Sequence, residues 1–437
     1  MTRSVQIILV AAMALPAAAW GEDAMPDPLS QEQIDRRIRE HRTAEVTLRV
    51  LSPEGKPLAG AKVTVRQVRH KFLFGSNVGL VGRFPTPQLE QAFRQRYAAL
   101  MNFATIPFYW GGYEPQPGQT QAAQRRIMAD WCKENRIIAK GHPLVWHNVV
   151  PTWLAAKPGE KVEELLLDRV TREVKDFADT VDAWDVVNEP VVMPAAGAGN
   201  PIAALCSKPG RTQLIVKAFA AARKANPKAL LVLNDYDNSK AFVDLVQSCL
   251  DAGASIDAIG LQTHMHKGFF GAKDLWAICE RFAKFKKPIH FTELTILSGE
   301  LMKRRDNDWF TRRASWPSTP QGLKSQAAQA VEVYSVLFSH PSVEAITWWD
   351  FSEHRSWMNA PSGLLNPDMT PKPVYTALMN LIKKKWWTGP QALTTDAAGH
   401  ATFRGYLGDY EIITPSGPIA FSVGKAGKVS LDVQAKK

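Results

Sequence analysis

The chain has 437 residues, of which 45% are hydrophobic and 22% charged, so it can form one large domain with small additions, and wholesale disorder is excluded. Its formal net charge of +11 would suit an anionic partner, but the Lys and Arg residues are spread along the chain, apart from short runs such as Lys383–Lys385. We interpret the charge as a solvated basic surface and expect no nucleic-acid partner.

The first residues have the pattern of a secretory signal peptide. Arg3 supplies the positive start, residues 5–19 are apolar, and Ala17-Ala18-Ala19 is a small-residue cleavage site. The apolar stretch is too short to span a bilayer comfortably, and no later stretch reaches about 18 residues. We predict a signal peptide over residues 1–21 and a secreted or periplasmic protein without a membrane partner.

The region 22–70 is predicted as an N-terminal segment with a β-hairpin. VTLRV (46–50) and AKVTVRQV (61–68) alternate in strand fashion, and the turn-rich SPEGKPLAG lies between them.

From Lys71 onward, short apolar runs alternate with amphipathic helical stretches, which predicts a (β/α)8 TIM barrel of the α/β class over residues 71–388. The active site of such a barrel lies at the C-terminal ends of its strands. A doubly wound open sheet is the competing architecture, but Gly75, Gly79 and Gly82 lack the spacing of its phosphate-binding turn. The strand candidates are 72–78, 101–110, 137–146, 181–189, 229–236, 256–264, 288–296 and 343–351; the helical stretches include 91–100, 121–136, 163–178, 214–225, 241–253, 274–285, 326–338 and 374–386.

The C-terminal region, residues 389–437, returns to strand and turn patterns. A barrel chain enters its first strand and leaves its last helix at the same face. We therefore predict that these strands and the 45–70 segment meet below the barrel as one small accessory β-region. Structural support of the barrel is the favoured role of this region, and polysaccharide binding is the alternative.

Cysteines and histidines indicate no metal site or cofactor. Cys132, Cys206, Cys249 and Cys279 lack CxxC spacing, and the chain has no HExxH motif, which argues against a metal-dependent hydrolase. In an exported protein one or two disulfides are open to these cysteines, but the sequence does not pair them.

Polar and aromatic residues end seven of the eight strand candidates, where they would be costly in the barrel core but suit its rim. Glu189 ends the fourth strand and Glu293 lies in the seventh, so their side chains can reach across the barrel mouth. Paired carboxylates flanking a bond are the equipment of glycoside hydrolysis. Tryptophan faces stack on sugar rings, and the candidates for this are Trp110, Trp146, Trp349 and Trp357.

With these residues in place, the chain resembles glycoside hydrolase family 10, the retaining endo-β-1,4-xylanases. The resemblance covers about residues 72–387 and implies an enzyme that cleaves a xylan-like polysaccharide by double displacement. It rests on six motifs in the family's order: GHPLVWH (141–147), WDVVNEP (184–190), LNDYD (233–237), IDAIGLQTHM (256–265), FTEL (291–294) and the WW…SW…PKPVY series (348–375).

The resemblance also implies roles for single residues. Glu189 is the acid/base, Glu293 is the nucleophile, and Asn188 binds the 2-hydroxyl of the sugar in the −1 subsite. The other substrate-binding residues that it implies are His142, Gln262 and His264 as polar lining, Trp146, Trp349 and Trp357 as aromatic walls, and Tyr236 on the aglycone side.

Departures from the family pattern concern the −2 subsite. Where the family carries Glu-Asn-x-x-Lys-Trp, this chain has Thr105, Ile106 and Tyr109 in place of the three polar ligands, and Val149 replaces a Gln. Each lost hydrogen bond typically costs about 0.5–1.5 kcal/mol, so unsubstituted xylan is expected to bind weakly there. Tyr109, with Phe108, is expected to offer a stacking surface instead.

Two further departures lie near the nucleophile. The family commonly pairs the histidine at 264 with an Asp, where this chain has Thr295, and we expect Asp235 or Asp350 to substitute. Asp350 stands where the family usually has Gly, so it is expected to enter the pocket and favour a different hydroxyl pattern.

The predicted function is therefore that of a monomeric, retaining endo-1,4-β-xylanase. One alternative is a glycanase for a decorated xylan or another β-linked glycan, because the −2 subsite is altered. The other is a non-catalytic carbohydrate-binding barrel. The presence of Glu189, Asn188, His264 and Glu293 argues against that reading, since binding alone needs no positioned acid and nucleophile.

Overall fold

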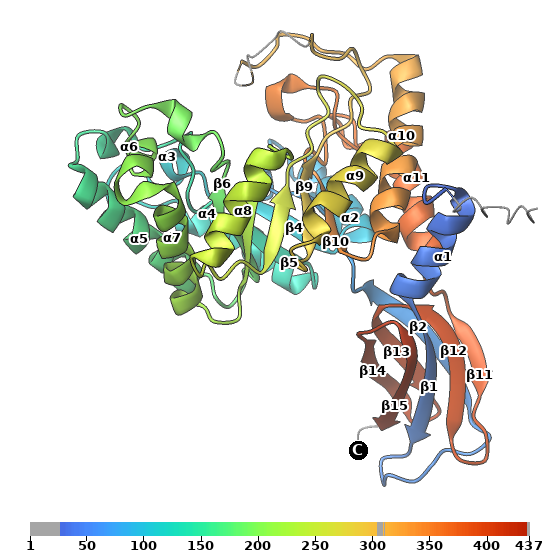
Figure 1. The fold of residues 1–437 in the computed structure, drawn as a ribbon. Coiled ribbons are helices and arrows are strands. Elements are labelled where there is room, and N and C mark those ends of the chain that lie inside the picture. The colour runs from blue at the N-terminus through green and yellow to red at the C-terminus, as the bar shows by residue number, and fades with distance from the viewer. Residues whose placement is uncertain (1–26, 304–308, 310, 435–437) are drawn as a thin grey trace, which may run out of the picture.

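The computed structural model describes residues 27–303, 309 and 311–434. These residues form a closed barrel surrounded by helices, with a small β-sandwich at one end (Figure 1). The predicted signal peptide, residues 1–21, lies outside the described residues. Among the helices of the described part, none is both long enough and apolar enough for a membrane span.

Eight parallel strands close the barrel, so the predicted (β/α)8 fold is confirmed. Each strand is short, and in β6 and β9 every residue is buried, as expected for parallel strands covered on both faces. Around the barrel the strands are β10 (Val343–Trp348), β3 (Leu73–Asn77), β4 (Phe103–Pro107), β5 (Ile138–His142), β6 (Ala183–Asn188), β7 (Leu230–Asp235), β8 (Ala258–Leu261) and β9 (Ile289–Leu294).

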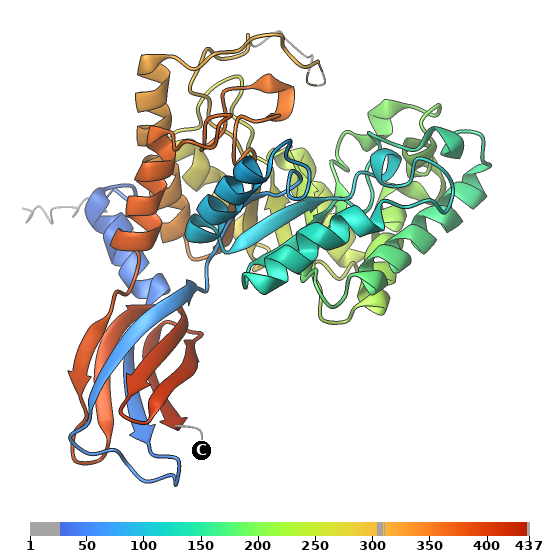
Figure 2. The same cartoon turned by 180° about the vertical axis from the view of Figure 1, so that it is seen from behind.

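A helix follows each barrel strand and packs on the outside of the barrel (Figure 2). Several helix starts are set by capping, because Thr86, Ser239 and Thr319 accept hydrogen bonds from first-turn N–H groups. These helices are α2 (Pro87–Leu100), α4 (Ala122–Glu134), α5 (Gly159–Asp176), α7 (Arg211–Ala225), α8 (Lys240–Asp251), α9 (Ala272–Ala283), α10 (Pro320–Ser339) and α11 (Pro373–Asn380). Shorter helical segments are α3 (Trp110–Tyr113), α6 (Pro201–Ala204), Thr152–Leu154, Met193–Ala196, Cys206–Gly210, Trp357–Asn359 and Leu381–Lys385.

Packing inside the barrel depends on a glycine next to a candidate site residue. A Cβ atom on Gly141 would collide with the ring of Trp184, which is fully buried and packs edge-on against Phe108. The absence of a side chain at Gly141 lets the Trp184 ring fill the core directly beside His142, the last residue of β5.

The accessory β-region is a sandwich in which N-terminal and C-terminal strands pair, as predicted. One sheet has the order β12 (His400–Tyr406), β1 (Thr43–Leu51) and β15 (Gly427–Gln434). The other has the order β11 (Gln391–Thr394), β2 (Lys62–His70), β13 (Gly408–Thr414) and β14 (Gly417–Val423).

The predicted β-hairpin at 45–70 is wrong, because β1 and β2 lie in different sheets. Each strand alternates and buries one apolar face, and Val46 and Leu48 of β1 share a core with Val63 and Val65 of β2. Because β1 and β2 face each other across the two sheets, these side chains are buried between the sheets. If the two strands paired directly, the side chains would lie side by side on one face of a single sheet.

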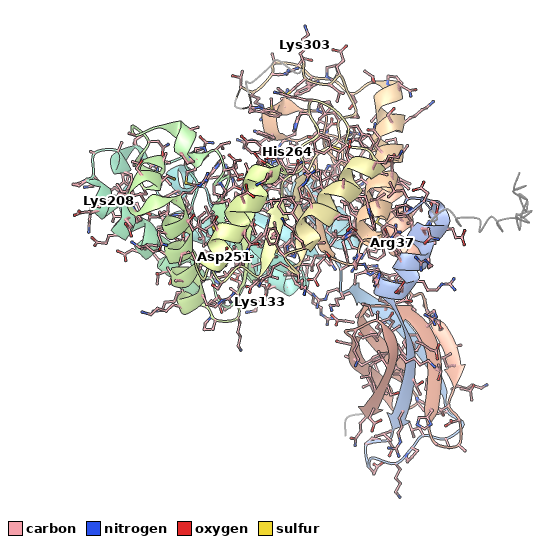
Figure 3. All side chains as sticks on the ribbon, in the orientation of Figure 1. Arg37, Lys133, Lys208, Asp251, His264 and Lys303 are labelled. Carbon is pink, nitrogen blue, oxygen red and sulfur yellow. The ribbon has the colours of Figure 1, made fainter. Side chains whose placement is uncertain are left out.

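Helix α1 (Gln31–Arg42), which was not among the predicted elements, joins the sandwich to the barrel. Arg42 donates hydrogen bonds to the carbonyl groups of Phe338, His340 and Val343, and Arg37 lies 4.3 Å from the ring centroid of Trp276. Figure 3 labels Arg37 near this junction and His264 at the barrel end that faces away from the sandwich. The sandwich is thus attached opposite the C-terminal ends of the barrel strands.

All four cysteines are free, so the structure contains none of the disulfides that are possible in an exported protein. Cys132, Cys249 and Cys279 are buried in helices that cover the barrel, and they fill the core as small apolar side chains.

Candidate active site

The C-terminal ends of the barrel strands and the loops that follow them surround a cleft of about 1240 Å³. The cleft brings together the twelve residues for which the sequence predicted a catalytic or substrate-binding role, but not the stacking candidate Trp110. They are Tyr109, His142, Trp146, Asn188, Glu189, Tyr236, Gln262, His264, Glu293, Trp349, Asp350 and Trp357.

Glu189 follows β6 directly, and its backbone has a left-handed φ of 52°, which turns the chain out of the strand. One carboxylate oxygen accepts a hydrogen bond from Gln262 Nε2 at 3.1 Å and the other from Trp146 Nε1 at 2.9 Å. Two donors from other strand ends therefore fix the position of this carboxyl group.

Glu293 lies in β9 and is only 4% exposed. Its Oε1 accepts a hydrogen bond from Asn234 Nδ2 at 2.9 Å, and its Oε2 is 3.2 Å from His264 Nε2. The His142 Nε2 atom lies 3.9 Å from Oε1. Positively polarised groups thus surround this carboxylate.

An amide network links the two carboxyl groups. Asn188 Oδ1 accepts hydrogen bonds from Asn234 Nδ2 at 2.8 Å and from Gln262 Nε2 at 3.2 Å, and these two amides also donate to Glu293 and Glu189. Because the Asn188 oxygen is occupied, its NH₂ group is left to face a ligand.

The surroundings displace the two carboxyl pKa values in opposite directions. Burial raises the pKa of Glu189, and the nearby Glu293 adds to this against the hydrogen bonds from Gln262 and Trp146. Burial also acts to raise the pKa of Glu293, but His142 and His264 outweigh it and hold that pKa below its usual value. The surroundings therefore favour a protonated Glu189 beside an ionised Glu293 in the pH range between the two pKa values.

A buried ion pair lies behind His142. Lys140 Nζ is 2.6 Å from Asp185 Oδ2, and the same oxygen is 2.8 Å from His142 Nδ1. Lys140 and Asp185 are both fully buried. Burial alone would raise the pKa of Asp185, but Lys140 and His142 lower it, so Asp185 stays ionised and orients the His142 ring.

His264 is oriented by Thr295, and the expectation that Asp235 or Asp350 replaces the missing Asp is wrong. His264 Nδ1 is 2.9 Å from Thr295 Oγ1. Asp235 instead accepts hydrogen bonds from Val191 N and Asp237 N. The contact with the Thr295 hydroxyl orients the ring so that its Nε2 atom faces Glu293 Oε2.

Asp350 lines the cleft as expected, but its oxygens already have partners. Oδ1 accepts a hydrogen bond from Trp357 N at 3.1 Å and Oδ2 one from Ser362 Oγ at 2.6 Å. Burial raises the pKa of Asp350 to about 6. The side chain therefore holds the loop that carries Trp357 at the cleft wall.

Only part of the expected aromatic surface of the −2 region reaches the cleft. The Tyr109 ring lies there, 5.5 Å from the His142 ring and 5.6 Å from the Trp146 ring. Phe108 is fully buried, and Trp110 donates a hydrogen bond to Glu114 outside the cleft. The proposals that these two stack on a sugar are therefore wrong.

Of the four substituted positions of this region, only Tyr109 lines the cleft. Thr105 and Ile106 are fully buried in β4, and Val149 does not line the cleft. Neither Thr105 nor Ile106 is available to hold a sugar hydroxyl, which agrees with the expectation of a changed −2 subsite.

Aromatic rings form the remaining walls. The Trp349 ring is edge-on to the His142 ring at 5.5 Å, and the Trp357 ring lies 4.8 Å from His264. Trp309, which the sequence interpretation missed, stacks on Trp357 at 6.0 Å and also lines the cleft. On the far side Tyr236 is 49% exposed, a position open to a sugar ring.

Three polar residues of the site had no assigned role in the sequence interpretation. Asn234 bonds both Asn188 and Glu293, and Lys140 and Asp185 support His142. Charged residues inside otherwise apolar strand runs are a signal that would have found the last two. In the described part of the chain, no three His, Cys, Asp or Glu residues gather in a way that would hold a metal ion.

Comparison with known proteins agrees with this architecture. Residues 95–381 match the sequence profile of Glycosyl hydrolase family 10. Endo-1,4-beta-xylanase B of Thermotoga neapolitana is 28% identical over 293 residues, which are 63% of this chain and 78% of that protein. The endo-1,4-beta-xylanase/feruloyl esterase of Xylanibacter ruminicola is 29% identical over 290 residues, 59% of this chain but only 38% of that protein.

A solved structure has the same fold. It is xylanase 10B from Thermotoga petrophila RKU-1 in complex with xylobiose, with a TM-score of 0.61 and 24% identity over 72% of this chain and 95% of that one. The family match spans more than half of this chain and includes both Glu189 and Glu293. The chain therefore belongs to glycosyl hydrolase family 10.

Proposed function

We propose that the protein is a retaining glycoside hydrolase that cleaves internal β-1,4 bonds of a xylan-type polysaccharide. The observation that carries this proposal is the pair Glu189 and Glu293 in one cleft, with pKa values displaced in opposite directions. The relatives named as endo-1,4-beta-xylanases support the substrate class.

In the first step, neutral Glu189 donates its proton to the departing glycosidic oxygen while ionised Glu293 attacks the anomeric carbon. A glycosyl ester of Glu293 forms and the leaving chain departs. The NH₂ group of Asn188 donates to the sugar 2-hydroxyl, and this hydrogen bond strengthens as the oxocarbenium-like transition state develops.

In the second step, Glu189 is ionised and takes a proton from water. The water attacks the same anomeric carbon and releases Glu293, so two inversions give net retention. Such chemistry needs carboxyl groups about 5 to 5.5 Å apart. Trp349 and Trp357 form the walls against which the sugar would stack.

The first test is product analysis on linear xylan, glucuronoxylan, arabinoxylan and cellulose. We expect xylo-oligosaccharides whose new reducing ends are first released as the β-anomer, observed by proton NMR. The Glu293→Ala variant should lose at least about 10⁴-fold in kcat, because no ester can form. An initial α-anomer would overturn retention, and glycan binding without any cleavage would favour a non-catalytic barrel.

The role of Glu189 has its own test. With dinitrophenyl β-xylobioside, the leaving group needs no proton, so Glu189→Ala should form the ester and release it slowly. Added azide should restore turnover and give the β-glycosyl azide, because azide needs no general base. A variant that azide does not accelerate would contradict the assignment of Glu189 as acid/base.

We also propose that the protein is exported and acts as a monomer. The N-terminal pattern at residues 1–21 supports export. Fractionation of expressing cells and the elution volume on size exclusion would test these two points.

A further inference from the structure

The cleft continues beyond the catalytic pair into a recess between the loops that follow the neighbouring strands β3 and β10. The two loops contact each other, because the Phe84 ring stacks on the His354 ring at 5.5 Å. We call this part the β3–β10 recess and define it by Asn77, Leu80, Phe93, Ser352, His354 and Arg355, all of which line the cleft.

Arg355 presents an exposed guanidinium group at the lip of the recess. No ion pair joins it to a carboxylate of the described residues. The adjacent carboxylate, Glu353, is held by Lys372 at 2.6 Å. Arg355 therefore has a positive charge in the cleft that the described residues leave uncompensated.

The backbone that carries Arg355 is fixed. Arg355 has a left-handed φ of 58°, and on either side Glu353 N donates to Leu365 O at 2.9 Å and Ser356 N donates to Glu353 O at 3.3 Å. These contacts hold the Cα atom of Arg355 at the edge of the recess.

The groups around Arg355 add hydrogen-bond donors. Burial lowers the pKa of His354, and Arg355 and Arg312 lower it further, so the ring is neutral and can donate one hydrogen bond. Asn77 Oδ1 accepts from Gly79 N at 2.7 Å, which leaves the Asn77 NH₂ group as a donor. Ser352 is 4% exposed, and its Oγ has no hydrogen-bond partner in the described part of the chain.

Two carboxylates of this region could oppose an anion, Glu353 and Asp350, and both have partners. Lys372 holds Glu353. Ser362 and the Trp357 N–H group bond the oxygens of Asp350, and burial raises the pKa of Asp350 to about 6. Meanwhile Thr105 and Ile106 are buried, so they hold no sugar of the main chain. A ligand in this region must gain its affinity from another group.

We propose that the β3–β10 recess binds a carboxylate on a branch of the glycan, with Arg355 as its counter-ion. This inference rests on the proposed glycanase function and specifies its substrate class, a xylan-type chain that carries uronic acid branches. Binding of the branch supplies the affinity that Thr105 and Ile106 cannot provide through the main chain. The net charge of +11 assists the approach of an acidic polymer.

The test compares glucuronoxylan with the same polymer after chemical reduction of its carboxyl groups, which keeps every branch but removes its charge. For the unmodified enzyme we expect kcat/KM to be about three- to tenfold higher on the acidic polymer, the range for a partly exposed charged contact. Added salt should shrink this ratio.

Three substitutions assign the effect to Arg355. The ratio should fall to about one in Arg355→Gln, fall below one in Arg355→Glu, and be partly kept in Arg355→Lys. Lys208→Gln is the matched control, because it removes the same charge from an exposed site outside the cleft and should keep the ratio. A ratio near one in the unmodified enzyme, or an unchanged ratio in Arg355→Gln, would overturn the proposal.

A binding measurement separates this proposal from the proposed function. Calorimetry on Glu293→Ala compares a xylo-oligosaccharide bearing one glucuronic acid with its carboxyl-reduced form. Failure to cleave any xylan would refute the proposed function alone. Tighter binding of the acidic ligand that disappears when Arg355→Gln is added would still support the recess, and equal binding of both ligands would refute it.

Discussion

Glu189 and Glu293 are chemically identical side chains whose surroundings give them different charges. Glu189 meets two neutral donors and an acidic neighbour, whereas Glu293 meets His142, His264 and Asn234. The difference arises from what each strand end places beside the carboxyl group, and it determines which of the two can donate a proton.

The pH dependence of the reaction follows from these shifts. Activity needs Glu293 ionised, and its pKa is lowered, so the acid limb of kcat/KM should lie below the ordinary glutamate pKa. Activity also needs Glu189 protonated, and its pKa is raised, so the alkaline limb should lie above that value. The measurement is kcat/KM against pH on xylan, whose departing oxygen needs the proton of Glu189. In Glu189→Gln the alkaline limb should vanish, and its persistence would assign that limb to another group.

Lys140 should set the position of the acid limb without touching substrate. Its ion pair keeps Asp185 charged, and Asp185 orients His142. His142 faces Glu293, and the other titratable groups near Glu293 are His264 and Glu189. Lys140→Met removes the charge at similar size, so the pKa of Glu293 should rise and the acid limb should move about half to one pH unit upward.

The control for this prediction is Lys140→Arg, which keeps the charge and should keep the limb near its original position. Thermal unfolding of each variant shows whether it folds. An acid limb that does not move in folded Lys140→Met would show that the ion pair serves stability alone.

At the scale of elements, close approach of β5 and β6 depends on Gly141. Gly141→Ala should lower the free energy of unfolding by about 1–3 kcal/mol, because the new methyl group collides with the buried Trp184 ring. Gly159→Ala in α5 is the control, since nothing lies within 4 Å of its Cβ position and alanine favours a helix. Urea unfolding measures both variants, and equal stability would show that the Trp184 ring moves aside without cost.

At the scale of the whole molecule, α1 and the sandwich are held against the barrel by Arg42. Arg42→Met would leave the carbonyl groups of Phe338, His340 and Val343 without this donor, which should cost about 1–3 kcal/mol. Arg49→Met is the control, because Arg49 is exposed and its ion pair with Asp432 spans 3.9 Å, a contact worth little. Differential scanning calorimetry should show a lower Tm for the first variant only. Equal Tm shifts in the two variants would show that apolar contacts, rather than Arg42, hold the junction together.

The free cysteines lead to a second prediction at this scale. Because no disulfide joins Cys132, Cys206, Cys249 or Cys279, a thiol reductant should leave Tm unchanged. Labelling of the unfolded chain with a thiol reagent should count four free thiols. Fewer thiols and a Tm that falls on reduction would show that the protein contains a disulfide.

The sequence by itself determined the barrel and the position of its site. Strand and helix periods are local patterns, and each of the eight predicted strands overlaps an observed one. Because parallel strands of a barrel end at one rim, residues as distant in sequence as His142 and Trp349 had to meet there. The cleft residues could therefore be named before their contacts were known.

Tertiary structure alone decided the partners. Alternation in β1 and β2 shows which face is buried but not which strand lies alongside, so the hairpin expectation failed. In the same way, the position of Phe108 at a strand end does not reveal that its ring packs into the core. Nor does the spacing of Lys140 and Asp185 reveal that Lys140 and His142 both contact the same oxygen of Asp185. The opposite pKa shifts of the two glutamates and the recess around Arg355 likewise arise from side chains that only folding brings within a few ångströms.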